Sequence, residues 1–140
     1  MTPEIRAAVV AETLSWLGTP YHHLAAVKRA GVDCAMLLVA VYQAVGLVPL
    51  SFDPRPYAPQ WFLHRSRELY LEHLALWAGP VTDPGPGDVA VYRFGRTAAH
   101  GAIIIDEQQL VHAYQPVGRV ELIERRALAP RFDSYWRPRS

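Results

Sequence analysis

The sequence has one cysteine, almost no net charge and no apolar run long enough to cross a membrane. A lone cysteine cannot close an intramolecular disulfide, so the fold does not depend on oxidation. The 14 Lys and Arg residues are balanced by 13 Asp and Glu residues, which leaves a net charge of +1. This balance provides no attraction for phosphate backbones or anionic lipids, so we expect neither nucleic acid nor a membrane as a partner.

A secretion signal is also missing. The segment MTPEIRAAVVAETLSWLG places Glu4, Arg6 and Glu12 among its apolar residues, whereas a signal peptide needs an uninterrupted apolar stretch. The sequence therefore predicts a protein made in the cytoplasm. Its 140 residues, 51% of them hydrophobic, are enough to bury one core, so we expect a single domain over 1–140.

The first half of the chain contains helical patterns. Thr2 can cap a helix that has Pro3 at its first position, and Gly18 and Pro20 should end it. The apolar residues at helical spacing, which should face the core, are Ala7, Val10, Ala11, Leu14 and Leu17.

A second helix should begin after an Asp33 cap and finish at Gly46, a residue suited to the left-handed position that follows a helix. Residues 35–41 have no polar side, which predicts a central, buried helix. Several prolines between 47 and 60 then indicate a long surface connection. A third helix is expected over about 62–77 from its apolar spacing, and it should bury Leu63, Tyr70, Leu74 and Trp77.

After PVTDPGPGD the pattern changes to short β-rich runs separated by turn residues. These runs are VAVYRF, GAIIID, LVHAY and RVELIE. Helices followed by strands predict an α+β fold, with an antiparallel sheet packed against the central helix.

Cys34 has two interpretations. Cysteine is often simply a buried packing residue. As the first residue of a helix, however, its sulfur would lie in the positive field of unpaired backbone amides, which favours the thiolate of a nucleophile. The neighbouring charge of Asp33 acts in the opposite direction, and capping alone is enough to explain that residue.

A cysteine nucleophile needs a base and a group that orients the base. Four histidines lie in a loop or on an expected surface helix and are weak candidates, namely His22, His23, His64 and His73. His100 and His112 are different, because they lie on neighbouring strands among aliphatic residues, where an imidazole needs a hydrogen-bonding partner. Each could be the partner of the other.

Taken in order, the motifs of the chain resemble those of the NlpC/P60 cysteine peptidases, papain-like enzymes that cut peptidoglycan stem peptides. The matching segments are GTPY (18–21), DC (33–34), PGD (86–88), HGAIII (100–105) and LVHA (110–113). The short forms found in phage tails and gene transfer particles are the most similar, because they share the GTPYHH motif, the proline-rich PRPYAPQW and the lack of a secretion signal or wall-binding domain.

The resemblance implies a role for each matching residue. Cys34 corresponds to the nucleophile, His100 to the general base and acid, and His112 to the orienting third member. Tyr21 and Asp33 correspond to positions that bind substrate or stabilise the oxyanion. No metal or other cofactor is implied.

The implied activity is cleavage of a peptidoglycan stem peptide, at the bond between the γ-carboxyl of D-glutamate and a diamino acid. A tail-tip or hub protein of a phage-like particle would be the partner, which would place the protein in a virion or tail that acts on the cell wall. One departure from the family is Met36, which stands where the family has glycine and would narrow or fill the substrate groove.

Three alternatives remain from the residues alone. The protein could be a tail-assembly component that keeps the fold without catalysis. One cysteine and two histidines are also plausible zinc ligands. Finally, the same thiol and imidazole chemistry serves acyl transfer to an amine or lipid.

The parity of side chains along the two histidine-bearing strands gives a geometric test. His100 and His112 can meet only if an even-numbered residue lies opposite His112, since side chains alternate between the faces of a sheet. A three-residue loop over 106–108 would put Ala102 there, with His100 as its diagonal neighbour. Loops of two or four residues would send the two rings to opposite faces.

Overall fold

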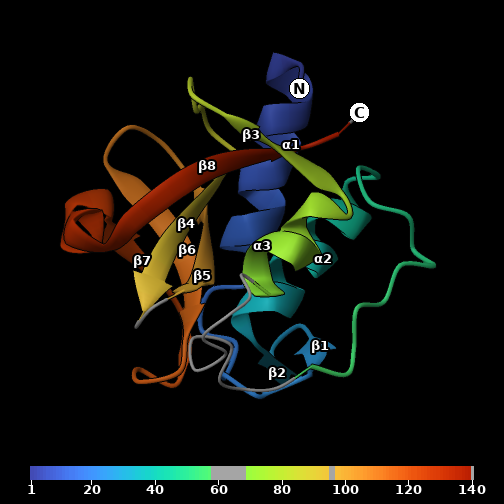
Figure 1. The fold of residues 1–140 in the computed structure, drawn as a ribbon. Coiled ribbons are helices and arrows are strands. Elements are labelled where there is room, and N and C mark those ends of the chain that lie inside the picture. Colours follow the sequence, from blue (N-terminus) through green and yellow to red (C-terminus); the bar gives the residue numbers. More distant parts are fainter. Residues whose placement is uncertain (58–68, 95–96, 140) are drawn as a thin grey trace.

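The computed structural model describes residues 1–57, 69–94 and 97–139 (Figure 1). The helices are α1 (Pro3–Leu14), α2 (Cys34–Ala44) and α3 (Leu69–Ala75). The strands of the main sheet are β3 (Ala78–Val81), β4 (Val89–Phe94), β5 (Thr97–Ile104), β6 (Gln109–Tyr114), β7 (Arg119–Glu124) and β8 (Phe132–Pro138). A small hairpin of β1 (Ala26–Val27) and β2 (Gly31–Val32) precedes α2, and two 3-10 turns precede β8, namely η2 (Arg125–Ala127) and η3 (Ala129–Arg131).

Helix α1 begins where the sequence predicts. The side chain of Thr2 accepts a hydrogen bond from the backbone N–H of Ile5 at 3.1 Å, and Pro3 occupies the first turn. The helix ends at Leu14, before the predicted stop at Gly18, and irregular turns cover the residues between them.

The buried side of α1 is not the predicted one. Leu14 and Leu17 are 37% and 41% exposed. The residues that face the core are instead Val9, Thr13 and Trp16. The apolar side chains of this helix are distributed around its whole circumference, so their spacing does not single out one side. The Thr13 hydroxyl can be buried because it donates to the Val9 carbonyl at 2.7 Å.

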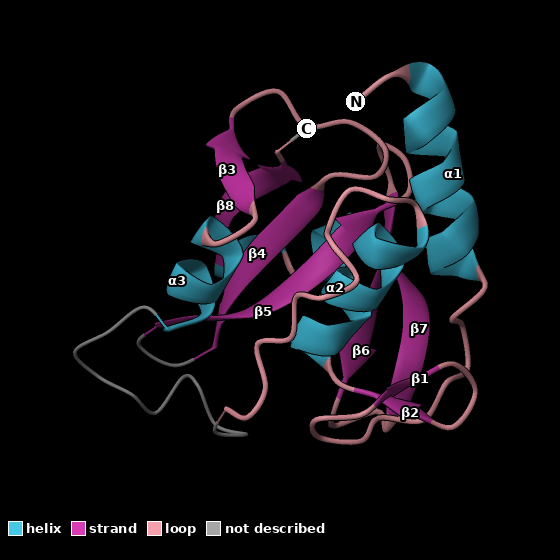
Figure 2. Cartoon of the chain, turned by 90° about the vertical axis from the view of Figure 1, so that its right-hand side faces the viewer, coloured by secondary structure: helices cyan, strands magenta, loops and turns pink. Residues whose placement is uncertain are grey.

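Helix α2 confirms its prediction. One carboxylate oxygen of Asp33 accepts from the Met36 N–H at 2.8 Å, and every residue from Cys34 to Val39 is buried. Gly46 has a positive φ of 82°, as the left-handed position after a helix requires. Figure 2 shows α2 lying across the sheet near β5, β6 and β7, with α1 beside it.

The third helix is described only from residue 69 onward, so the predictions for Leu63 and His64 lie outside the described residues. Tyr70 and Leu74 are fully buried, as predicted, and Trp77 is buried just after the helix ends. The surface position predicted for His73 is wrong, because its side chain is only 6% exposed. Its ring lies among the aromatic rings of the nearby Tyr70 and Trp77 and of the more distant Phe52.

The main sheet has the strand order β3-β8-β4-β5-β6-β7, and all neighbouring strands are antiparallel. Strands β4 to β7 are the four runs predicted from the sequence. The pairing of β3 with β8 was not predicted, because β3 contains Gly79 and Pro80, which look like turn residues. Proline is tolerated there since β3 is an edge strand. The α+β class is confirmed.

The two faces of the sheet bury separate apolar clusters. Odd-numbered residues of β5 and β6, among them Ile103 and Val111, pack with α1, α2 and α3. Even-numbered residues, among them Ala102 and Leu110, pack on the opposite face with Leu128, which lies between the two 3-10 turns. The sheet is therefore covered on both faces. Along the part of β5 and β6 near their ladder, odd- and even-numbered side chains join different clusters.

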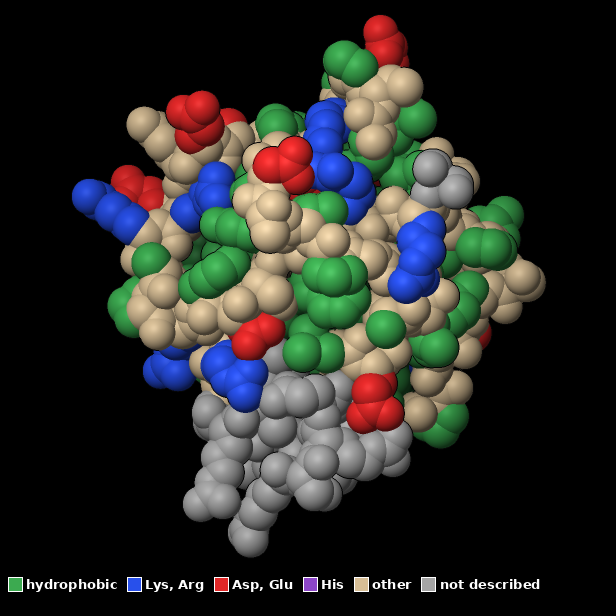
Figure 3. All heavy atoms as spheres, turned by 45° about the horizontal axis from the view of Figure 1, so that its top comes forward, with side chains coloured by type: hydrophobic (Ala, Val, Ile, Leu, Met, Phe, Trp, Pro, Cys, Tyr) green, Lys and Arg blue, Asp and Glu red, His purple; other side chains and the backbone are tan. Residues whose placement is uncertain are grey.

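Acidic and basic side chains are interspersed over the face drawn in Figure 3, where neither sign forms a continuous area. Of the helices within the described ranges, none is both long and apolar enough to cross a membrane.

Candidate active site

The turn between β5 and β6 sets the register of the two histidine-bearing strands. The paired residues are Ile103 with Val111 and Ile104 with Leu110. Ile105 then donates to the carbonyl of Gln109 at 3.0 Å, so the loop consists of residues 106–108. This register puts Ala102 opposite His112. The predicted three-residue loop is confirmed.

His100 and His112 meet on one face of the sheet. Nε2 of His100 lies 2.8 Å from Nδ1 of His112, and the ring centroids are 4.9 Å apart. On its far side, Nε2 of His112 lies 2.9 Å from a carboxylate oxygen of Glu121. Tyr114 stacks on the His112 ring with an interplanar angle of 11°. Both histidines are buried, at 6% and 1% exposure.

Burial keeps both rings neutral. Burial, together with the neighbouring His112, lowers the pKa of His100 to about 3. Burial also lowers the pKa of His112, although the Glu121 carboxylate acts in the opposite direction. At neutral pH each ring therefore carries one proton, and one nitrogen of each ring can accept a hydrogen bond.

Cys34, at the N-terminus of α2, meets β5 just beyond the end of the β5–β6 ladder. The backbone N–H of Ile105 donates to a carbonyl of β6, so the N–H groups of the odd-numbered residues of β5 point toward that strand. Gly101 is the next odd-numbered residue after the last ladder pair, and its backbone N–H lies near enough to the Cys34 sulfur to lower the pKa of the thiol. The thiol thus contacts the residue that directly follows His100.

Gly101 must be a glycine for this approach. A Cβ at that position would clash with the Tyr70 hydroxyl and lie 2.8 Å from Leu38 Cδ1. The missing side chain lets β5 pack closely against α2 and α3, which brings the N-terminus of α2 to the strand.

The net electrostatics at Cys34 differ from the prediction. Backbone N–H groups of Ala35, Cys34 and Gly101 do lower the thiol pKa. Burial outweighs them and, with the Asp33 charge, raises the pKa of Cys34 to about 12. The amides of the helix terminus thus favour the thiolate and Asp33 opposes it, as predicted, but burial, which the sequence did not reveal, decides the outcome and the resting protein holds a neutral thiol.

Tyr21 lies beside the Cys34 thiol, close enough for the two side chains to interact electrostatically. The residue is half-buried, and its backbone bridges to Val32 just before the Asp33 cap. Burial, followed by the nearby Cys34 and Asp33, raises the pKa of Tyr21, so the hydroxyl stays protonated. It can donate to a negatively charged atom at this site.

Asp33 is almost fully buried and its carboxylate is saturated with donors. In addition to the Met36 amide, it accepts from the Leu24 N–H at 2.8 Å and from the Tyr57 hydroxyl, which lies 2.7 and 2.6 Å from its two oxygens. The residue ties three segments together next to the thiol. A role for Asp33 in binding substrate stays a prediction.

Of the weaker histidine candidates, His22 is exposed as predicted, but His23 is not idle. Its Nε2 lies 3.1 Å from the carbonyl oxygen of Tyr57, and its Nδ1 lies 3.5 Å from the Asp33 carboxylate. Met36 is 3% exposed and belongs to the apolar core, which favours the filling interpretation over an open groove.

Sequence reasoning missed Tyr57, Gly101 and Glu121. The first lies in the proline-rich connection, where no spacing rule places a side chain. The third had a usable signal, because a four-residue turn ending in Gly118 puts Glu121 directly opposite His112.

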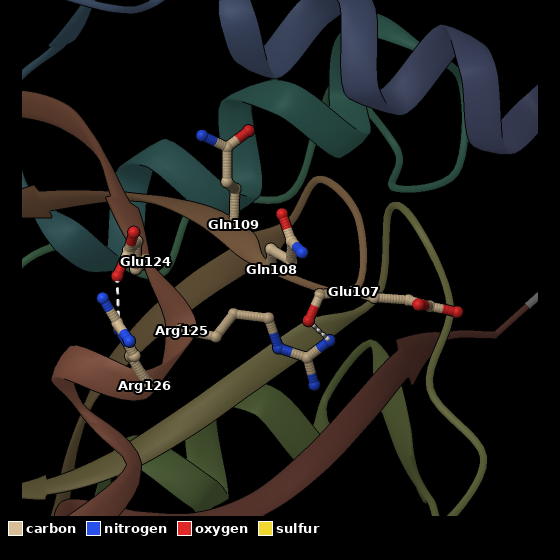
Figure 4. Close-up of a pocket in the computed structure, with 6 residues that line it drawn as sticks. All are labelled: Glu107, Gln108, Gln109, Glu124, Arg125 and Arg126. Carbon is tan, nitrogen blue, oxygen red and sulfur yellow. Dashed lines mark hydrogen bonds and ion pairs between the residues drawn. The ribbon is translucent and has the colours of Figure 1, made fainter.

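No group of three or more His, Cys, Asp or Glu side chains in the described ranges is arranged to hold a metal ion. A hollow of about 370 Å³ lies at the far end of the β5–β6 hairpin (Figure 4). Its lining residues are Glu107, Gln108, Gln109, Glu124, Arg125 and Arg126. None of the candidate catalytic residues is among them, and at about 3.3 Å per residue the turn is roughly 20 Å along β5 from His100.

Comparison with known proteins gives one family match. The model of the NlpC/P60 family matches residues 18–139, a range that contains Cys34, His100 and His112. Among curated protein sequences, no significant match was found.

Several solved structures share the fold. The NlpC/p60 domain of the peptidoglycan hydrolase SagA has a TM-score of 0.61 at 22% identity, covering 93% of this chain and 96% of that one. The peptidoglycan hydrolase RipB from Mycobacterium tuberculosis has a TM-score of 0.61 at 19% identity, covering 97% and 64%. An NLP/P60 family protein from Staphylococcus aureus reaches 0.69 at 18% identity, covering 100% and 43%.

The chain spans less than half of some of these relatives, namely 43% of the S. aureus protein and 40% of a family member from Bacillus cereus. The likeness to the solved structures concerns the fold, and it covers nearly all of this chain.

Proposed function

Because the chain belongs to the NlpC/P60 family, we propose that it is a cysteine peptidase that hydrolyses the stem peptides of peptidoglycan. The observation that carries this proposal is the hydrogen bond of 2.8 Å between His100 and His112, next to Gly101, whose backbone amide lowers the pKa of the Cys34 thiol. SagA and RipB, which share the fold, are both described as peptidoglycan hydrolases, and this supports the substrate class.

In this proposal the sulfur of Cys34 attacks the carbonyl carbon of the peptide bond while His100 takes the thiol proton. The Cys34 N–H and the Tyr21 hydroxyl stabilise the negative oxygen that forms. His100 then gives its proton to the leaving amine, which leaves a thioester on Cys34. Water, deprotonated by His100, attacks that thioester; the C–S bond breaks, the acid is released, and His100 returns the proton to the Cys34 sulfur.

The resting protonation states determine when the proton moves. Burial keeps the Cys34 thiol and the His100 ring neutral, as the raised thiol pKa and the lowered imidazole pKa indicate. The proton is therefore transferred as the sulfur attacks, not before substrate arrives. His112 holds the His100 ring in place for that transfer.

We also propose the bond and the setting. The bond is the one between the γ-carboxyl of D-glutamate and a diamino acid, the linkage that the family favours. The GTPYHH motif and the proline-rich PRPYAPQW segment support a place in a phage-like tail, with a tail-tip or hub protein as partner and the cell wall as the site of action.

Purified protein incubated with muropeptides of known structure tests the activity. Mass spectrometry should find two fragments whose masses sum to substrate plus one water, with the new amine on the diamino acid. The Cys34→Ala variant should leave the substrate intact. Fragments joined to an added amine would indicate acyl transfer, and full activity of the variant would remove Cys34 from the mechanism.

The tail assignment has its own test. Particles purified from the producing bacterium should contain this chain in the tail fraction when their proteins are identified by mass spectrometry. Particles without the chain would contradict the assignment and leave the peptidase proposal in place.

A further inference from the structure

The hydrogen-bonded pair of histidines continues to a carboxylate. Glu121 lies directly across from His112 in the β6–β7 register, and its carboxylate oxygen is 2.9 Å from Nε2 of that ring. His112 is 1% exposed, and the Glu121 side chain is 23% exposed. The chain of polar contacts therefore begins near solvent at β7 and ends at His100.

Strand β7 holds Glu121 firmly, although it is an edge strand. The adjacent Val120 donates to the carbonyl of Thr19 at 2.9 Å and accepts from the N–H of Gly18 at 3.0 Å. These bonds tie β7 to the segment that carries Tyr21. The backbone on which Glu121 sits is thus fixed on both edges, which is the condition for a well-oriented side chain.

The direction of the hydrogen bonds follows from Glu121. An ionised carboxylate only accepts, so the His112 nitrogen that faces it, Nε2, carries the ring proton. A neutral imidazole has one proton, so Nδ1 of His112 is an acceptor. Nε2 of His100 must then be the donor of the bond at 2.8 Å. Nδ1 of His100 is left as the basic nitrogen of that ring.

We propose that Glu121 is a positioning residue that, through His112, keeps Nδ1 of His100 unprotonated and ready to take the proton of Cys34. The inference rests on the proposed function for its kinetic consequence. Glu121 acts through His112, which it contacts at 2.9 Å, and it extends the array of Cys34, His100 and His112 by one residue.

Without the carboxylate, the donors and acceptors in this series of hydrogen bonds can be reversed. His112 can then carry its proton on Nδ1 and donate to Nε2 of His100, which moves the His100 proton to Nδ1 and blocks transfer from the thiol. Stacking by Tyr114 at 11° restrains the plane of the His112 ring but places no constraint on its proton. The carboxylate is what selects one direction.

The test uses Glu121→Leu, which removes the acceptor, and Glu121→Gln, which is nearly isosteric and can accept or donate. The matched control is Glu124→Gln, on the same strand but 57% exposed and paired with Arg126. Nitrogen-15 NMR of the resting proteins reports which nitrogen of each histidine is protonated. Muropeptide cleavage gives kcat and KM.

In the parent protein both His100 and His112 should be protonated at Nε2. Glu121→Leu should show a mixture of the Nδ1-protonated and Nε2-protonated tautomers of these rings (their two ring forms), with kcat lowered about 10- to 100-fold and KM unchanged. Glu121→Gln should lie between this variant and the parent, and Glu124→Gln should match the parent in both measurements.

Parent-like ring forms in Glu121→Leu would overturn the inference, and so would altered ring forms with an unchanged kcat. If the leucine variant does not fold, Glu121→Gln carries the same test on the ring forms. The NMR measurement needs no substrate. A parent protein that cleaves no muropeptide would therefore count against the proposed function, whereas the ring forms would still decide the role of Glu121.

Discussion

Two buried histidine sites in this protein differ in what their rings contact. His73 on α3 and His100 on β5 are each 6% exposed. The ring centroid of His73 lies 6.1 Å from each of three aromatic rings, those of Phe52, Tyr70 and Trp77. His100 instead bonds His112 at 2.8 Å, and that ring bonds Glu121.

Burial alone does not separate the two sites. It lowers the pKa of His73 to about 4 and that of His100 to about 3, so both rings are neutral at pH 7. A perturbed pKa in a buried position is therefore a weak sign of catalysis by itself. What marks the candidate active site is the hydrogen bond of His100 to His112, which continues to Glu121, together with the thiol near the next residue.

The largest expected effect separates the two histidines directly. His100→Ala should lower kcat/KM for muropeptide cleavage by about 10²- to 10⁴-fold, because the base and acid are lost together. His73→Phe, which keeps an aromatic ring in an aromatic surrounding, should stay within about threefold of the parent. Equal losses in the two variants, with both folded by circular dichroism, would remove the distinction.

The next effect tests the close approach that gives His100 its neighbouring thiol. Gly101→Ala should cost about 1–3 kcal/mol in the free energy of unfolding, because the added methyl group meets Tyr70 and Leu38. The accompanying shift of β5 from α2 should lower the cleavage rate by up to about 100-fold.

Gly79→Ala on β3 is the matched control for this substitution, because a Cβ there meets no atom within 4 Å. Urea denaturation and muropeptide assays of the two variants give the comparison. Parent-like stability of Gly101→Ala would show that α2 and β5 do not pack as closely as the structure has them.

A smaller effect should appear in the pH dependence of stability. His73, His100 and His112 all have a lowered pKa in the folded protein, against an ordinary value of 6.5. The unfolded chain therefore binds more protons below pH 6.5, and stability present above that pH is lost as the pH falls toward the folded values.

His73→Phe isolates one of these contributions. Between pH 7 and pH 5 it should lose roughly 2 kcal/mol less of its unfolding free energy than the parent, since one buried histidine no longer binds a proton on unfolding. Urea denaturation at the two pH values measures the difference. Identical losses in parent and variant would mean that His73 is accessible to protons in the folded protein.

The smallest expected effect is on the cleavage rate itself. The pKa of His100 lies near 3 and that of Cys34 near 12, so neither changes protonation between pH 5 and pH 9. With a peptide substrate that has no group titrating in that range, kcat/KM should vary less than about twofold. An acid limb near pH 6.5 would show instead that the catalytic histidine is exposed.

Features that depend on nearby residues could be predicted from the sequence. The Asp33 cap and the buried helix that follows it are set by hydrogen bonds within one turn and by a run without polar residues. The loop at 106–108 is set by the two-residue alternation of strands, once His100 and His112 are required to meet. These determinants lie within about a dozen residues of one another, so the local pattern contains them.

The tertiary structure decided everything that depends on distant segments. The apolar side chains of α1 are distributed around the helix, and only its packing against the sheet and α2 determines that Val9 and Thr13 are buried. The segment around Pro80 is a strand only because it pairs with β8, which lies far along the sequence. Burial by the assembled fold reverses the thiolate-favouring field at Cys34, because desolvation of a charge exceeds what a few backbone amides return. The Cys34 sulfur reaches the Gly101 N–H only because β5 leaves its ladder with β6 where the N-terminus of α2 arrives, and no local pattern encodes that meeting.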